Sequence, residues 1–159
     1  MDDAQFFREA TLAICGDLAL ERALAACFGV VVQRIPADAA FLELYDFELG
    51  TMRGIAKATA AGGERIDVIV PLPEVGMRRV ETVDSSDVHI INRPEENPIA
   101  LAMNEAFHTP GASSLAIPLA VGADPVGVFV ISRLSGEPFG DDEAALFGSL
   151  NEPVAVALS

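Results

Sequence analysis

Histidine and cysteine side chains, which most often hold metals or carry covalent chemistry, are few in this chain. The two histidines are His89 and His108, and Glu105 precedes His108 by three residues on an expected helix. A metal site usually needs three or four His, Cys or carboxylate ligands at characteristic spacings. We therefore expect no metal or haem site, and we interpret His89 as a strand residue that makes a hydrogen bond.

The cysteine thiols and serine hydroxyls also lack the surroundings of a catalytic nucleophile. Cys15 and Cys27 both fall in helical patterns, and two cysteines are too few for a disulfide framework. Buried, reduced thiols are favoured over a redox pair, because free cysteine is commonly a core residue. The serines at 85–86 and 113–114 have no neighbouring histidine to act as a base. We predict no catalytic residue and no enzyme.

Arg93 is the charge whose surroundings suggest binding. It follows an expected strand and precedes the helix start at Asn97-Pro98. An arginine beside a helix N-terminus can hold a carboxylate or a phosphate. The alternative is a surface ion pair with Glu95 or Glu96, and we favour that alternative.

The charge balance restricts the partners. The 159 residues include 24 acidic and 10 basic ones, which gives a formal net charge of −14. Residues 81–159 contain only two basic residues, Arg93 and Arg133. Nucleic-acid surfaces need clustered basic residues, and an anionic membrane repels an acidic protein. We therefore expect neither nucleic acid nor a membrane as a partner.

The same composition predicts a cytoplasmic protein with one packed domain. Hydrophobic residues form 51% of the chain, enough for a core in a domain of this length. The apolar runs fall far short of the roughly 20 residues of a membrane-spanning helix. The chain begins Met1-Asp2-Asp3, without the basic residues of a signal peptide.

The elements that must position these side chains begin with two helices. Residues 4–15 predict a helix with Phe7, Ala10 and Ile14 on its apolar side. Asp17 is a candidate N-cap for a second helix, and Pro36 marks its end. Apolar residues recur there at helical spacing, at Leu20, Leu24, Cys27, Phe28 and Val31.

Residues 39–60 change to the alternating pattern of a β-hairpin. Strands are expected at 39–45 and 51–60, and Gly50 supplies a positive φ in the loop between them. The first strand has Phe41, Glu43 and Tyr45 on one face. In the second strand the residues expected to share a face are Met52, Gly54, Ala56 and Ala58.

The remaining chain alternates strands and helices. Gly62-Gly63 is expected to break the chain. The elements expected after it are a strand at 66–72, a short helix at 73–81, a strand at 88–92, a helix that Asn97 caps, and strands at 115–121 and 126–132. A last helix is expected to start near Asp141, and Pro153 is expected to bend it. Hairpins imply an antiparallel sheet, and the helices at both chain ends can pack together over one face. The fold class is therefore α+β.

A sequence pattern in the C-terminal half is typical of a known family. Residues 114–119 read SLAIPL, residues 126–131 read VGVFVI, and residues 138–143 read PFGDDE. Their order and spacing resemble GAF domains, the small-molecule-sensing fold related to PAS. The resemblance implies a GAF-like central antiparallel sheet with the N- and C-terminal helices packed on one face.

Three further stretches of the sequence resemble one particular group of GAF domains. Residues 34–50, 91–103 and 150–159 look like the N-terminal sensory GAF domain of bacterial sigma-54-dependent transcriptional activators, in which an AAA+ ATPase and a helix-turn-helix domain follow. The chain has no G-x-x-x-x-G-K-[ST] run of an ATPase. We therefore expect residues 1–159 to be a single GAF-like domain excised from a longer multidomain protein.

Ligand sets of other GAF branches do not occur. Cyclic-nucleotide-binding GAF domains have an Asn directly before a Lys, and the single lysine of this chain, Lys57, has no Asn before it. Residues 28–159 contain no Cys to attach a bilin or to serve a free methionine sulfoxide reductase. We therefore expect no cofactor, and the small-molecule effector is unknown.

The resemblance also implies where a pocket lies. In GAF domains it lies between the sheet and the segments that link its middle strands. That location gives six candidate lining residues, which are Tyr45, His89, Arg93, Met103, Phe107 and Phe129. An ordinary core position is the favoured alternative for Phe107 and Phe129.

The function that the resemblance implies is a regulatory sensor. Its terminal helices would signal to an output domain and form a homodimer interface. A ligand-free dimerisation or protein-interaction domain is the alternative, since GAF domains often serve only in that way. An enzyme is the least favoured hypothesis, because the sequence gives little reason to expect ionisable groups converging in one cleft.

Overall fold

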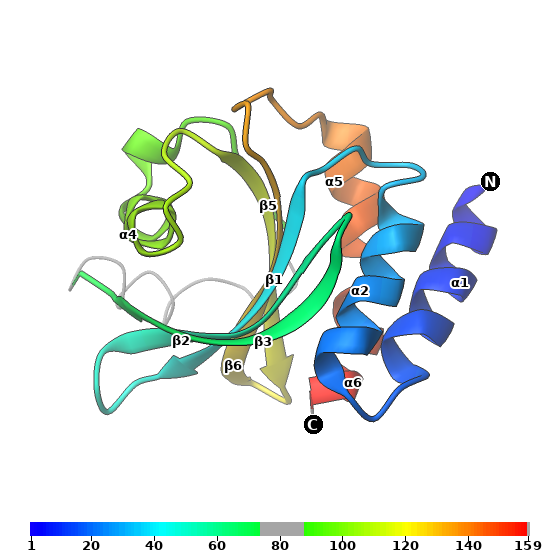
Figure 1. The fold of residues 1–159 in the computed structure, drawn as a ribbon, viewed down its shortest axis with the longest axis horizontal. Helices are drawn as coiled ribbons and strands as arrows, with labels where there is room; N and C mark the ends of the chain where they lie inside the picture. The colour runs from blue at the N-terminus through cyan, green and yellow to red at the C-terminus, as the bar shows by residue number, and fades with distance from the viewer. Residues whose placement is uncertain (74–87, 159) are drawn as a thin grey trace.

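A single antiparallel sheet runs through the centre of the computed structural model, which describes residues 1–73 and 88–158 (Figure 1). Within these residues the strand order is β3-β2-β1-β6-β5-β4. The strands are β1 (Ala39–Asp46), β2 (Thr51–Thr59), β3 (Gly62–Pro71), β4 (His89–Ile91), β5 (Ser113–Val121) and β6 (Asp124–Arg133). The predicted hairpins are confirmed as β1–β2 and β5–β6, and Gly50 has a φ of 64°.

One face of the sheet, the terminal-helix face, is covered by helices from both chain ends. These helices are α1 (Asp3–Cys15), α2 (Leu20–Val31), α5 (Asp141–Gly148) and α6 (Asn151–Leu158). Figure 1 shows α1 outermost, against α2, with α5 and α6 behind. Phe6, Leu24 and Phe147 are among the fully buried side chains of this core. The predicted α+β class, with the terminal helices on one face, is confirmed.

The opposite face, the α4 face, is covered by helix α4 (Pro98–Ala106) and the short 3₁₀ helix η1 (Pro94–Glu96). Asn97 caps α4 as predicted, because its Oδ1 accepts hydrogen bonds from the backbone N–H groups of Ile99 and Ala100. Phe41, Met103 and Val130 are buried in the apolar cluster of this face. Strands β1 and β6 lie at the centre of the sheet, which explains why β6 is apolar on both faces.

Strand β2 departs from the predicted pattern at a bulge. The register between β1 and β2 shifts so that Leu42 pairs with Ala56 and Glu43 pairs with Gly54, which leaves Ile55 as the extra residue. Met52 therefore lies on the α4 face, whereas Ala56 lies on the terminal-helix face. The prediction of one shared face was wrong, because a bulge reverses the alternation.

The N-terminal helices differ from the predictions in two details. Phe6, not Phe7, joins Ala10 and Ile14 in the core, and Phe7 is 43% exposed. Asp17 is not the N-cap of α2, which begins after Ala19. Its carboxylate instead accepts from the Ala19 N–H and pairs with Arg22 at 2.9 Å. The ion pair with Arg22, followed by the Ala19 hydrogen bond, lowers the pKa of Asp17 to about 2.

The C-terminal helix is two helices. A turn at 149–150 separates α5 from α6, where the Leu150 N–H donates to the Phe147 carbonyl. Pro153 is therefore the third residue of α6, and the expected bend at this proline was wrong. A proline in the first helical turn loses no hydrogen bond, because the N–H groups there have no intrahelical acceptor.

Two other expectations concern the middle of the chain. Gly62 and Gly63 do not break it; they begin β3, and the turn lies at residues 60–61. The short helix expected at 73–81 falls almost entirely outside the described residues. Within the described part of the chain, the helices are all too short or too polar to span a bilayer.

Candidate functional site

A buried carboxyl group lies on the α4 face of the central strand β1. Glu43 is 0% exposed, and neither of its carboxyl oxygens has a hydrogen-bond partner among the described residues. Phe41, two residues earlier, points to the α4 face, and the β1–β6 register is regular from Ala39 to Leu44. The alternation of a strand therefore directs Glu43 to the α4 face as well.

Aromatic side chains surround this position. Glu43 pairs with Gly54 on β2, and the Phe107 ring lies over Gly54, where a Cβ would come within 2.8 Å of Phe107 Cζ. The Phe107 and Phe41 ring centroids are 4.5 Å apart. Tyr45 packs on the same cluster. Gly54 thus leaves room beside Glu43 that an aromatic ring from the end of α4 fills.

The environment alters the protonation of this group. Burial raises the pKa of Glu43 to about 8, because the apolar surroundings disfavour the charged form. Burial, and then the nearby Glu43 carboxyl group, raise the pKa of Tyr45 above its ordinary value. Glu43 is therefore a mostly neutral acid at pH 7 that an opposite charge would ionise.

A cation already lies on this face. Lys57 Nζ is 6.0 Å from the centroid of the Phe41 ring. The negative faces of aromatic rings attract cations at such distances. The rings beside Glu43 can therefore contribute to binding a positive group.

The structure brings together three of the six predicted lining residues. Tyr45, Met103 and Phe107 all belong to the apolar cluster of the α4 face. Phe129 does not, because it lies in the core of the terminal-helix face with its ring centroid 5.0 Å from that of Phe147. The structure thus places Phe129 on the other face of the sheet from Tyr45, Met103 and Phe107, in the ordinary core position that was its favoured alternative.

The other two predicted residues lie toward the edge of the same face. His89 on the edge strand β4 pairs with Ala116, which is part of the α4-face cluster. The Arg93 side chain is 74% exposed and its Nη1 lies 3.6 Å from Glu96 Oε1. This is the favoured surface ion pair, so Arg93 is occupied by its own neighbour rather than aimed at the buried carboxyl group.

Sequence reasoning did not single out Glu43 as a buried, unpartnered acid. It placed Glu43 on the same face as Phe41 and Tyr45, but did not ask how an acid is tolerated there. The signal was available, because Glu43 is the one charged residue in the stretch 39–45. A lone acid at the centre of an apolar strand is a candidate for a buried polar site.

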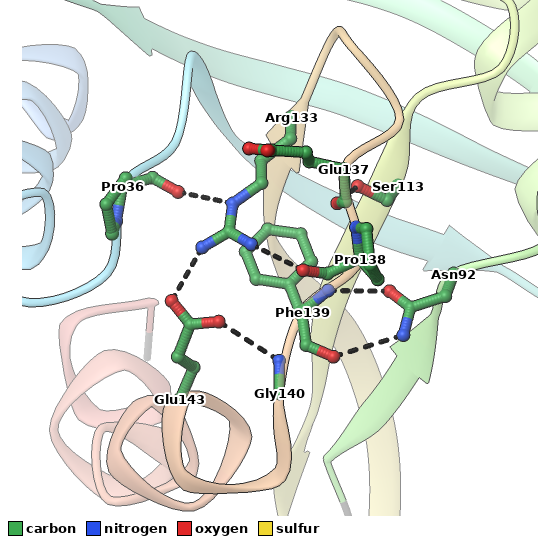
Figure 2. Close-up of polar contacts among 9 residues, drawn as sticks. All are labelled: Pro36, Asn92, Ser113, Arg133, Glu137, Pro138, Phe139, Gly140 and Glu143. Atoms are coloured by element: carbon green, nitrogen blue, oxygen red, sulfur yellow. Dashed lines mark hydrogen bonds and ion pairs between the residues drawn. The ribbon is translucent and has the colours of Figure 1, made fainter.

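A second polar cluster, also missed, joins the sheet to α5 (Figure 2). Arg133 Nε donates to the Pro36 carbonyl at 2.7 Å, and its two terminal nitrogens reach the Pro138 carbonyl and Glu143 Oε2 at 2.7 and 2.6 Å. Its guanidinium carbon lies 3.9 Å from the centroid of the Phe139 ring. Each of the three guanidinium nitrogens of Arg133 thus has a partner within the fold, which indicates a structural residue.

Asn92 extends this cluster toward the α4 side. Its Oδ1 accepts from the Phe139 N–H at 2.8 Å and its Nδ2 donates to the Phe139 carbonyl at 3.1 Å. Asn92 immediately precedes Arg93 and η1, so it connects the segment leading to α4 with the start of α5. Figure 2 shows both hydrogen bonds of the Asn92 amide and the stacking of Arg133 beside Phe139.

The two cysteines differ in exposure. Cys27 is buried, and burial followed by the neighbouring Cys15 raises its pKa to about 12. Cys15 is exposed, so the prediction of two buried thiols was wrong for it. Within residues 1–73 and 88–158, no three His, Cys, Asp or Glu side chains come together as metal ligands.

An open groove of about 800 Å³ lies on the outer side of α4. Its lining includes Leu101, Glu105 and His108. His108 adopts a positive φ of 57° where the chain leaves α4. The groove is exposed and lies on the side of α4 away from the sheet, so the Glu43 carboxyl group does not line it.

Comparisons with known proteins agree with this architecture. A family model for the GAF domain matches residues 17–159. None of the curated proteins compared with the chain matches it. The GAF domain of a phosphoenolpyruvate-protein phosphotransferase from Coxiella burnetii is similar with a TM-score of 0.66 and 18% identity, over 99% of this chain and 93% of that one.

Two further solved structures have the same fold. The phycocyanobilin-bound GAF domain from a cyanobacterial phytochrome gives a TM-score of 0.70 at 16% identity, over 99% of this chain and 94% of that one. The A. aeolicus nlh2 GAF domain in an inactive state gives 0.64 at 16% identity, over 98% and 94%. At these identities the likeness concerns the fold.

Proposed function

Because the chain belongs to the GAF domain family, we propose that it is a regulatory sensor domain that binds a small molecule against the α4 face. The observation that carries the proposal is Glu43, a buried carboxyl group without a partner among the described residues, beside the rings of Phe41, Tyr45 and Phe107. A group of this kind costs folding free energy, and ligand recognition gives a reason to keep it. The phycocyanobilin-bound relative supports the idea that this fold accommodates a small molecule.

A connection between the two faces supports signalling. Asn92, next to η1, holds Phe139 through two hydrogen bonds, and Arg133 joins that segment to Glu143 in the first turn of α5. A ligand that shifts α4 would pull on this cluster. We propose that the change reaches the terminal helices in this way and passes from them to an output domain.

The output that we propose is transcription, through an activator of the sigma-54-dependent type. The support is the sequence resemblance of residues 34–50, 91–103 and 150–159. The reading frame of the gene tests this point. An AAA+ ATPase with a G-x-x-x-x-G-K-[ST] run encoded after this domain would support it, and a different output domain would contradict it.

The terminal helices also support a homodimer. On α1, Phe7 is 43% exposed and Leu12 is 67% exposed, which leaves apolar surface on the outermost helix. We propose that two copies pair through this helix. Sedimentation equilibrium tests the proposal, since a monomer at high micromolar concentration would contradict it.

Binding of a small molecule is tested by thermal unfolding in the presence of a metabolite library. A compound at a hundredfold over its Kd stabilises the folded state by about 2.7 kcal/mol, which raises the midpoint temperature measurably. The proposal predicts at least one such compound, and NMR shifts that centre on Phe107 and Glu43. A library without any stabilising compound would favour the alternative, a ligand-free interaction domain.

A further inference from the structure

The Glu43 carboxyl group points to the chemistry of the ligand. Both of its oxygens are buried and without a hydrogen-bond donor among the described residues. We propose that the α4 face recognises a small organic cation, in which an amidinium, guanidinium or ammonium group pairs with Glu43. The inference rests on the proposed function, because it names the ligand class for the same site.

The Glu43 carboxyl group lacks a hydrogen-bond donor among the described residues. A carboxyl group buried without hydrogen bonds destabilises a protein, whereas an apolar side chain has no such cost of desolvation. Its two direct cross-strand partners, Gly54 and Val128, have no donor side chain. A ligand that brings N–H groups would satisfy both oxygens at once.

A positive charge fits the site better than a neutral donor. A cation and a carboxylate form charge-assisted hydrogen bonds, which are roughly twice as strong as neutral ones. The Phe41 ring already has the Lys57 ammonium group 6.0 Å from its centroid. The net charge of −14 also attracts cations to the protein from a distance.

An apolar or aromatic body is expected on the same ligand. Phe41 and Phe107 stack in a tilted arrangement over the sheet, and Phe107 is only half-buried. A flat ligand can stack on these rings or take the place of Phe107 above Gly54, where the sheet has no side chain.

Three probes of one shape test the proposal. Benzamidine is a cation with a planar amidinium group, benzamide is its neutral counterpart, and benzoate is its anionic counterpart. Their Kd values are measured at pH 7.5 by NMR titration against the whole chain, Glu43→Gln and Glu48→Gln. Glu48 is exposed in the β1–β2 turn, so Glu48→Gln removes the same charge without touching the site.

The expected result is that benzamidine binds the unmodified chain at least about tenfold more tightly than benzamide or benzoate, as a charge-assisted pair implies. Glu43→Gln should remove that advantage, and Glu48→Gln should keep it. The three probes are also compared on the unmodified chain alone, so the preference for a cation can be tested even if Glu43→Gln does not fold.

Two results would overturn the inference. Benzamidine binding that equals that of benzoate, or that Glu43→Gln leaves unchanged, would refute the cation class while the sensor proposal stands. No binding by any of the three probes at 10 mM would also refute it. The sensor proposal itself is then decided separately by the metabolite library, whose compounds are not restricted to cations.

Discussion

The Phe107 ring lies directly over Gly54, so that a Cβ at residue 54 would come within 2.8 Å of Phe107 Cζ and 3.2 Å of Ile66 Cδ1. Gly54 is also the cross-strand partner of Glu43. The absence of a side chain at residue 54 therefore sets how closely the end of α4 approaches the buried carboxyl group.

Gly54→Ala should push the Phe107 ring away from the sheet. Overfilling a packed site typically costs about 1–3 kcal/mol, and we expect a loss near the low end because the Phe107 ring is the end of a side chain. Urea unfolding measures the change. Gly29→Ala is the matched control, because its Cβ meets no atom within 4 Å on helix α2 and should stabilise the chain by about 0.5–1 kcal/mol. Equal effects of the two variants would contradict the close packing at Gly54.

The Glu43 carboxyl group should make stability fall as pH rises. Its pKa of about 8 in the folded chain lies above the value of about 4.5 for an exposed glutamate, so the folded state holds a proton that the unfolded state releases. The stabilisation is complete below pH 4.5 and is lost between pH 4.5 and 8, by up to about 1.4 kcal/mol per pH unit.

The free energy of unfolding of the unmodified chain and of Glu43→Gln, measured from pH 5 to 8, checks this slope. The other ionisable groups that described strands place on the α4 face are Tyr45, Lys57, Glu64 and His89, and both proteins retain them. The difference between the two curves should therefore report Glu43. Parallel curves would show that Glu43 keeps an ordinary pKa.

Arg133→Ala should destabilise the chain strongly. It removes three hydrogen bonds of the guanidinium group and leaves the half-buried Glu143 carboxylate without its ion-pair partner. Breaking such a pair costs about 3–5 kcal/mol in buried sites. Arg93→Ala is the control, because its exposed ion pair with Glu96 should contribute less than about 1 kcal/mol. Thermal unfolding of both variants measures the difference. Equal midpoint temperatures of the two variants would contradict the structural role of Arg133.

Pro153→Ala should leave the helix content unchanged. Pro153 lies in the first turn of α6, where no backbone hydrogen bond is missing. The break between α5 and α6 is instead fixed by the turn in which the Ser149 hydroxyl and the Leu150 N–H donate to the carbonyls of Leu146 and Phe147. Far-UV circular dichroism checks the prediction, and a clear gain in helix signal would mean that the proline interrupts one long helix.

Local signals in the sequence predicted most of the elements. The Asn97-Pro98 cap, the Gly50 hairpin and the alternation of β5 and β6 depend on neighbouring residues, so sequence reasoning could find them. The faces of β2 could not be predicted in the same way, because the bulge at Ile55 depends on pairing with β1. Phe129 lies on a strand that is apolar on both faces, so its own sequence neighbourhood could not show which face it joins.

The candidate site also contains residues that the sequence could identify and residues that it could not. Tyr45, Met103 and Phe107 could be assigned to one region through the family resemblance. The lack of a partner for Glu43 and the enclosure of Arg133 depend on segments far apart in the chain, such as Pro36 and Pro138 around Arg133. Composition and spacing contain no information about such contacts.

Hydrogen exchange of backbone amides tests the central claim, that occupancy of the α4 face is communicated to the terminal helices. The measurement compares the chain with and without saturating benzamidine, and repeats both with Asn92→Ala, which removes the two hydrogen bonds to Phe139. We predict altered protection in α4 and also in α5 and α6, with the change in α5 and α6 lost in Asn92→Ala. A change confined to the α4 face in the unmodified chain, or no change at all, would contradict the account.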